Sequence, residues 1–135
     1  MILGIGIDLV EIDRFKAWTD YSKDKLLKLF SESEVEYCLE NSKKSAERLA
    51  ARFATREAFY KAFSQMAPDN DIPFLELCKL VKISANKKGA PLLLANWPII
   101  RQKTDLSLDP EPLCWISITH TSKQATAMVI IEKRD

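Results

Sequence analysis

The chain has 135 residues, enough to bury a substantial core, and we expect residues 1–135 to form a single domain. Its 20 basic and 19 acidic side chains give a net charge of +1, which argues against bulk binding of nucleic acid. No apolar run is long enough to span a membrane, and three isolated cysteines argue against a disulfide framework or a zinc site and favour a reducing, cytoplasmic compartment.

The first predicted element is a buried strand over Ile2–Ile12, because this segment is apolar and rich in β-branched residues. The run begins without basic residues before it and contains an acid, which argues against a signal peptide. Alternation places Gly4, Gly6 and Asp8 on one face, where glycines often mark the close approach of a ligand or of another backbone. A carboxylate in an apolar strand is costly unless it is paired or coordinates a cation. Asp8 is therefore either a ligand-binding acid or a structural one, paired with Arg14 or capping the next helix.

Two helices are predicted between this strand and residue 40. The segment Phe15–Phe30 carries several lysines among apolar residues and is assigned to one basic helix. Ser31 followed by Glu34 is a capping-box signature, which predicts a second helix that ends near Leu39.

A long central helix is predicted from Ser45, which can act as its N-cap, to the residue before Pro68. At about 100° per residue its large apolar side chains form one stripe, and Glu57 and Lys61 fall beside that stripe among small alanines. Small side chains would leave open space there, so the helix offers a place for a charged ligand. Glu57 and Lys61 at i,i+4 also fit an ordinary stabilising surface pair. Four cations surround Glu57 in the sequence: Arg48, Arg52, Arg56 and Lys61.

The C-terminal half is predicted to be mostly strands, with one more helix that starts at Asn96, just before Pro98. The last two strands are joined by the short segment HTSKQ, which contains the only histidine, His120, so they form an antiparallel hairpin. A strand, several helices and then mostly strands predict an α+β fold. The strands are assigned to Leu77–Ala85, Leu92–Leu94, Leu113–Thr119 and Ala125–Glu132, with loops at Pro68–Pro73 and Asp105–Pro112.

Three segments together resemble the holo-acyl-carrier-protein synthase family of phosphopantetheinyl transferases. They are GIGIDLVEIDR at Gly4–Arg14, RFATREAFYKAF at Arg52–Phe63, and ISITH with TAMVIIE at Ile116–His120 and Thr126–Glu132. The family patterns stand in the same order and at similar positions, so the resemblance spans the whole chain. It implies the phosphopantetheinyl transferase fold, with an antiparallel sheet packed against the long central helix.

The resemblance implies a transferase of fatty acid and lipid biosynthesis. Such an enzyme moves the phosphopantetheine arm of coenzyme A to a serine of acyl carrier protein and releases adenosine 3′,5′-bisphosphate. Mg²⁺ is the implied cofactor, with Asp8 and Glu57 as its ligands, and a homotrimer with sites between subunits is the implied assembly. The residue types agree, since a hard cation needs few protein carboxylates and phosphoryl transfer depends mostly on positioning and charge neutralisation.

The resemblance also implies roles for individual residues. The serine hydroxyl must lose a proton, and Glu57, directly or through a bound water, is the first candidate for the base. His120, which matches a family histidine near the site, is the second, and Lys61 completes the implied catalytic set. Acidic carrier protein would dock on the first helix through Arg14, Lys23 and Lys28. Coenzyme A would be bound by Lys43, Lys44, Arg52, Arg56, Lys61 and, from a neighbouring subunit, Gly89 and Pro91.

The sequence departs from the family pattern at three places. Arg56 replaces a lysine, Ala90 replaces the lysine of a G-K-P turn, and Phe63–Met66 replaces a glycine-rich turn resembling G-T-G. These departures imply altered contacts with coenzyme A. Two alternatives stay open: a coenzyme A or nucleotide-binding module without transferase activity, and an RNA-binding domain. The latter rests on the basic helix alone and lacks the exposed aromatic pattern of known RNA-binding modules.

Overall fold

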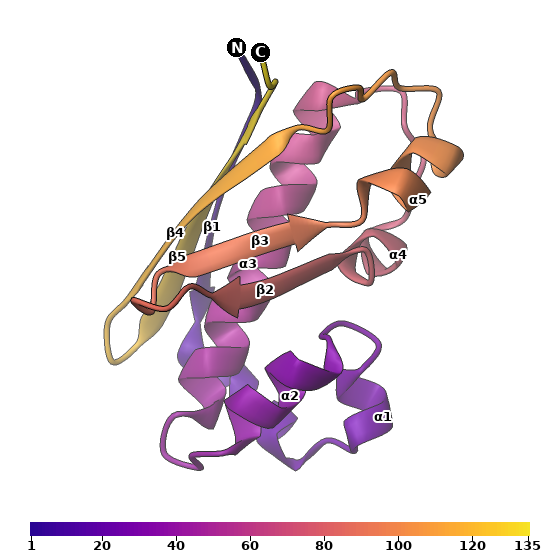
Figure 1. The fold of residues 1–135 in the computed structure, drawn as a ribbon. Coiled ribbons are helices and arrows are strands. Elements are labelled where there is room, and N and C mark those ends of the chain that lie inside the picture. Colours follow the sequence, from indigo (N-terminus) through magenta and orange to yellow (C-terminus); the bar gives the residue numbers. More distant parts are fainter.

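The fold is built around one long helix, α3 (Ser45–Met66), which packs on a three-stranded sheet while a two-stranded sheet crosses it (Figure 1). The computed structural model describes all residues, 1–135. The larger sheet has the strand order β1-β5-β4 and the smaller one pairs β2 with β3, and every pairing is antiparallel. The strands are β1 (Ile2–Glu11), β2 (Val81–Ala85), β3 (Pro91–Ala95), β4 (Leu113–His120) and β5 (Gln124–Glu132). The other helices are α1 (Lys23–Leu26), α2 (Glu32–Leu39), α4 (Phe74–Cys78) and α5 (Trp97–Lys103). The predicted α+β fold is confirmed.

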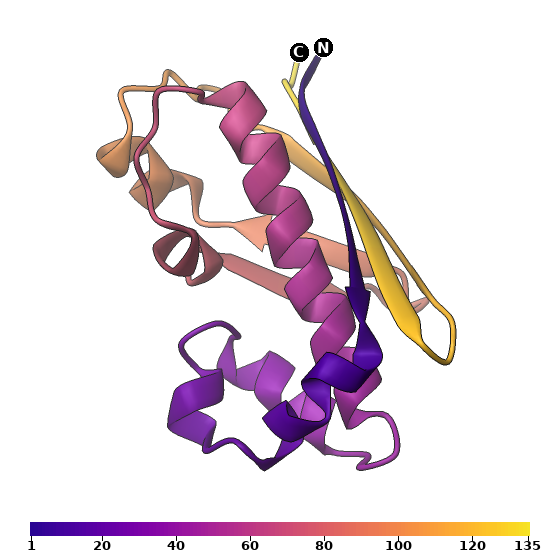
Figure 2. The same ribbon diagram turned by 180° about the vertical axis from the view of Figure 1, so that it is seen from behind.

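Strand β1 and helix α3 meet backbone to backbone along their length (Figure 2). A Cβ atom added to Gly4 would lie 2.0 Å from the carbonyl oxygen of Ala62, and one added to Gly6 would lie 1.7 Å from that of Ala58. The helix turns a row of fully buried alanines toward the sheet: Ala50, Ala54, Ala58 and Ala62. The expected open space beside these alanines is therefore absent, because the glycines allow the strand to fill it.

The opposite face of the larger sheet is apolar and exposed. Ile5, Ile7 and Leu9 of β1 alternate with the buried glycine row and point away from α3. Met128 of β5 is paired with Ile7, and Trp115 of β4 lies one strand further across the sheet. We call these five residues the outer sheet face. A contiguous apolar surface of this kind marks an interaction site more often than a free surface.

The segment between β1 and α2 differs from its prediction. A single helix was expected over Phe15–Phe30, but the chain forms two 3₁₀ turns, at Ile12–Phe15 and Ala17–Asp20, followed by the four-residue helix α1. Phe15, Trp18 and Tyr21 are spaced by three residues, which matches the 3.0-residue turn of a 3₁₀ helix. The ring of Trp18 lies 4.6 Å from that of Phe15 and 5.8 Å from that of Tyr21. Aromatic packing therefore sets the local conformation.

Two of the predicted helix N-caps are confirmed, and one prediction is wrong. Ser31 and Glu34 form the predicted capping box of α2, and Asn96 caps α5 through the N–H of Ile99. Lys44, not Ser45, is the N-cap of α3, and the hydroxyl of Ser45 donates to the carbonyl of Asn41.

The predicted strand Leu77–Ala85 is only partly confirmed. Its first residues belong to α4 and the turn after it, and β2 begins at Val81. The prediction counted Leu77 and Leu80 with Val81 and Ile83 as one apolar strand, but the spacing of three between Leu77 and Leu80 fits a helical turn that buries Leu77. The hairpin β4–β5 and the short strand before α5 are confirmed. No helix in the structure combines the length and the apolar character needed to cross a bilayer.

Candidate active site

Asp8 follows the two glycines on the inner face of β1 and lies where that strand passes the middle of α3. Nζ of Lys61 lies 3.1 Å from a carboxylate oxygen of Asp8 and donates a 2.8 Å hydrogen bond to the carbonyl of Ile7. The Asp8 side chain is 15% exposed. Asp8 therefore pairs with neither of its predicted structural partners: its ion pair is with Lys61, and it caps no helix.

Glu57 lies on the same helix as Lys61 but makes no hydrogen bond or ion pair with it or with any other side chain, so the predicted surface pair does not form. Burial raises the pKa of the Glu57 carboxyl, and the charge of Asp8 raises it further, while Lys61 and Arg14 act in the opposite direction. The effect of the Asp8 charge on Glu57 indicates that a strand and a helix bring the two carboxylates into one electrostatic site.

The two carboxylates fit a hard divalent cation. No group of three or more potential metal ligands is present, so a cation held here would have only these two protein ligands. Mg²⁺ suits such a pair because it commonly keeps several waters and is held by one or two carboxylates together with substrate phosphates. Glu57 has no hydrogen-bond or ion-pair partner in the protein, so its carboxylate oxygens are available to a cation.

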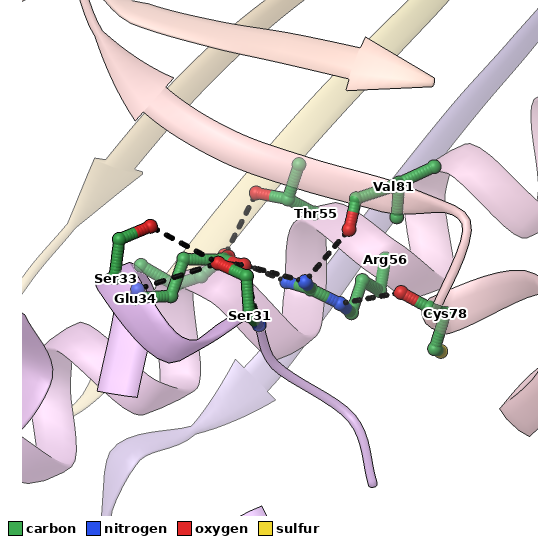
Figure 3. A network of polar contacts seen from close by, with 8 residues as sticks. Ser31, Ser33, Glu34, Thr55, Arg56, Cys78 and Val81 are labelled. Atoms are coloured by element: carbon green, nitrogen blue, oxygen red, sulfur yellow. Dashed lines mark hydrogen bonds and ion pairs between the residues drawn. The ribbon is translucent and has the colours of Figure 1, made fainter. Parts of the chain in front are cut away.

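Arg56 does not lie in this site, which corrects its assignment as a coenzyme A ligand. Its guanidinium is buried and forms two 2.7 Å hydrogen bonds to the carboxylate of Glu34, with further bonds to the carbonyls of Cys78 and Val81 (Figure 3). Neighbouring helix residues point about 100° apart, so Arg56 faces the core when Glu57 faces the strand. The sequence predicts Glu34 only as a capping residue, because nothing in the sequence links it to a residue 22 positions later.

Cations gather around the N-terminal half of α3. Lys43 and Lys44 are exposed just before the helix. The guanidinium carbons of Arg48 and Arg52 lie 4.0 and 4.3 Å from the ring centre of Tyr37. Arg48 also donates to the carbonyl of Tyr37, whereas Nε of Arg52 is buried without a partner. Arg52 thus has a donor without a hydrogen-bond partner, unlike Arg48 with its backbone contact, and remains a candidate ligand for an anion.

His120 lies on the same face of the sheet as Asp8, but not beside it. Asp8 pairs with Ala127 and His120 with Ala125, so the two residues are two strands and one row apart, roughly 12 Å between Cα atoms. Nε2 of His120 lies 3.2 Å from Oε1 of Glu47, a residue that sequence analysis did not select.

Gly89 lies in the exposed turn between β2 and β3, and Pro91 begins β3, so both belong to a different sheet from Asp8. Gly89 has a φ of +85°, which explains the glycine, and the side chain of Asn86 accepts the N–H of Ala90. At the other departure from the family pattern, α3 continues to Met66, and Gln65 accepts the backbone N–H of Ile5.

The three predicted docking cations are exposed but differ in their surroundings. The guanidinium carbon of Arg14 lies 4.8 Å from the ring centre of Phe53, and its charge acts on Glu57, so Arg14 borders the carboxylate pair. Lys23 forms a 2.8 Å ion pair with Glu32, and Lys28 makes no ion pair.

The fold agrees with comparisons with known proteins. The family model of the 4′-phosphopantetheinyl transferase superfamily matches residues 4–129. The chain therefore belongs to the 4′-phosphopantetheinyl transferase superfamily.

Within that superfamily, similar proteins include several holo-[acyl-carrier-protein] synthases. The chain is 36% identical to a holo-[acyl-carrier-protein] synthase of Staphylococcus haemolyticus, with 100% of both chains covered. It is 29% identical to a holo-[acyl-carrier-protein] synthase of Helicobacter pylori solved with coenzyme A, with a TM-score of 0.68 and 95% and 99% of the two chains covered. The corresponding values for the Bacillus anthracis protein, solved with coenzyme A (3′,5′-ADP), are 25%, 0.71, and 99% of each chain.

Proposed function

We propose that the protein transfers 4′-phosphopantetheine from coenzyme A to a serine of apo acyl carrier protein in a Mg²⁺-dependent reaction. The observation that carries this proposal is the pair Asp8 and Glu57, held beside Lys61 at the contact of β1 and α3. The names of the similar proteins and their coenzyme A complexes support the substrates.

In this reaction the serine oxygen attacks the phosphorus that bears the pantetheine arm. A new P–O bond forms, the pyrophosphate P–O bond breaks, and adenosine 3′,5′-bisphosphate leaves. Mg²⁺ held by Asp8 and Glu57 would neutralise charge on the pyrophosphate. Lys61 adds positive charge at the same place and fixes Asp8. Glu57, directly or through a bound water, would take the serine proton.

The rest of coenzyme A would follow α3 toward its N-terminus. Lys43 and Lys44 precede a helix in which each residue adds about 1.5 Å, so they lie roughly 20 Å from Glu57. That separation suits a long ligand with anionic groups at two places. Arg52 lies between the two ends, with an unpartnered Nε, and would contribute a phosphate contact.

We further propose that the active form is a homotrimer in the cytoplasm that serves fatty acid synthesis. The outer sheet face supports self-association, since it exposes large apolar side chains from three strands. Gly89 and Pro91 would then reach the coenzyme A of a neighbouring subunit from the β2–β3 turn. Sedimentation of the parent and of an Ile7→Lys variant tests this assembly, which requires a trimeric parent and a smaller variant.

The decisive experiment is mass spectrometry of apo acyl carrier protein incubated with the protein, coenzyme A and Mg²⁺. The carrier should gain one phosphopantetheine, and omission of Mg²⁺ or addition of EDTA should prevent the gain. A parallel incubation without the protein is the control for chemical modification. Binding of coenzyme A without any gain of mass would favour the alternative, a coenzyme A-binding module that lacks transferase activity.

A further inference from the structure

Strand β1 lies at an edge of the larger sheet, because only β5 pairs with it. The backbone N–H and C=O groups that point away from the neighbouring strand have no partner within the sheet. Two of these groups in β1 are nevertheless bonded to side chains of α3. The side-chain oxygen of Gln65 accepts a 2.9 Å hydrogen bond from the N–H of Ile5, and Nζ of Lys61 donates a 2.8 Å bond to the carbonyl of Ile7. Gln65 lies in Phe63–Met66, where the family pattern has a glycine-rich turn that could not supply the first bond.

The spacing of these two bonds fits a helix that lies along a strand. The later helix residue bonds to the earlier strand residue, so α3 and β1 run in opposite directions. Lys61 and Gln65 are four residues apart, which advances an α-helix by about 6 Å. Ile5 and Ile7 are two residues apart, which advances a strand by about 6.6 Å. The two side chains therefore reach two successive outward-pointing residues of the same edge, and we call this pair of bonds the edge clamp.

The packing of β1 on α3 needs such a restraint, because it offers few side chains that interlock. The strand presents Gly4 and Gly6 to the helix, and the helix presents Ala58 and Ala62 to the strand. Glycines also weaken a strand, and the pairing of β1 with β5 is irregular between Ile2 and Gly4, directly before the edge clamp. The two hydrogen bonds therefore oppose a displacement of the strand along the helix, which small side chains resist poorly.

We propose that Gln65 is a positioning residue for the transfer reaction, which acts through β1 and keeps Asp8 beside Lys61 and Glu57. This inference rests on the proposed function and adds to it a residue that touches neither the substrates nor the metal. Asp8 follows Ile5 by three residues in the same strand, and the ammonium of Lys61 bonds to Asp8 as well as to the strand backbone. Displacement of β1 along α3 would move Asp8 relative to Glu57, and Gln65 opposes that displacement.

Amide hydrogen exchange, followed by NMR without any ligand, tests the bond of Gln65. Gln65→Ala should speed the exchange of the Ile5 N–H about tenfold, because this edge group loses its only acceptor. Gln65→Glu, whose carboxylate still accepts, should restore most of the protection. The N–H of Ile7 points to the same side but does not bond to Gln65, so its exchange should stay unchanged. Equal exchange of Ile5 in the parent and in Gln65→Ala would overturn the proposal.

Kinetics test whether this bond positions Asp8. Gln65→Ala should lower kcat/KM about fivefold and raise the Mg²⁺ concentration that gives half the maximal rate, because a proposed metal ligand is displaced. Gln102→Ala, at an exposed glutamine of α5, is the matched control and should change neither quantity. A rate reduced by the same factor at every Mg²⁺ concentration would show that Gln65 does not act through Asp8.

A parent without transfer activity would refute the proposed function instead. The amide chemical shift of Asp8 would then decide the role of Gln65. Gln65→Ala should change this shift and Gln102→Ala should not, and an unchanged shift in Gln65→Ala would refute the positioning role.

Discussion

Arg56 and Glu34 form a two-pronged ion pair inside the protein, with each of two guanidinium nitrogens 2.7 Å from a carboxylate oxygen and the side chains 0% and 1% exposed. The same guanidinium donates to backbone carbonyls at the end of α4 and the start of β2. One buried cation thus joins α2, α3 and the first strand of the smaller sheet (Figure 3). Its planar fork makes four hydrogen bonds, which the single ammonium of a lysine could not match.

Glu34→Gln should destabilise the protein by about 3–5 kcal/mol at neutral pH, because it leaves the charge of Arg56 buried without its partner. Burial acts to raise the pKa of the Glu34 carboxyl, but the hydrogen bond and charge of Arg56, with help from Ser31, hold it below its usual value. The stabilisation is therefore present above the ordinary glutamate pKa of about 4.3 and is lost as the pH falls through the lower pKa of the folded state.

Urea unfolding at neutral and at acidic pH measures both effects. The parent should lose stability on acidification more steeply than Glu34→Gln, and Glu36→Gln on the exposed side of the same helix is the control. Equal unfolding midpoints for the parent and Glu34→Gln at pH 7 would contradict the assignment.

Asp8→Ala and Glu57→Ala should each abolish Mg²⁺-dependent transfer while the fold stays intact. Glu57 has no hydrogen-bond partner to lose, and Asp8 loses only its ion pair with a half-exposed Lys61. Mg²⁺ with coenzyme A should raise the Tm of the parent, since a ligand that binds only the folded state stabilises it, and should not raise the Tm of either variant. Near-normal turnover of either variant at low Mg²⁺ would show that the metal site lies elsewhere.

Lys28→Glu should slow association with acidic carrier protein and leave coenzyme A binding unchanged. Charge steering acts mainly on the association rate and weakens as salt screens it. Lys28 is the cleaner position, because Lys23 is already paired with Glu32, and Arg14→Glu would also act on Glu57. Stopped-flow or surface binding at two ionic strengths provides the measurement, with Lys79→Glu as an exposed control on a different element. An association rate that changes with neither the charge reversal nor the ionic strength would exclude this surface as the docking site.

His120→Ala should retain reduced but measurable turnover. An unperturbed histidine base has a pKa of about 6.5, so a reaction that depended on it would slow as the pH fell through that value. The base we propose is Glu57, which lies with Asp8, whereas His120 lies roughly 12 Å from Asp8 within one chain. A pH–rate profile of the variant beside the parent checks this expectation. Loss of activity at every pH, with coenzyme A bound at parental affinity, would make His120 the base.

Most helices and strands could be predicted from the sequence, because their apolar pattern extends over many residues or because capping and turn residues mark their ends. The first strand, the helix capped by Ser31, the central helix and the last hairpin are confirmed. The prediction of one helix over Phe15–Phe30 was wrong because aromatic residues spaced by three resemble an amphipathic helix, whereas their rings pack against each other along 3₁₀ turns. Short turns like these take their shape from tertiary contacts rather than from propensity.

The candidate site was predictable to the extent that its residues lie in motifs. Asp8, Glu57 and Lys61 are brought together, because motif residues on a strand and a helix can be matched by pattern. Arg56 could not be distinguished from Lys61 by charge alone, since only its angular position on the helix decides between core and site. The contact of Glu47 with His120 spans 73 positions of the chain and has no local signature.

Because β1 and α3 are in close contact, residues without functional groups determine the geometry of the candidate site. Asp8 belongs to the strand and Glu57 to the helix, so the gap between their backbones sets the separation of the two carboxylates. Gly6 and Ala58 define that gap by being small. A mutagenesis screen for altered metal preference that is restricted to polar residues would therefore miss Gly6 and Ala58, although these two residues set the separation of the carboxylates. Random libraries of this chain should include its glycines and alanines.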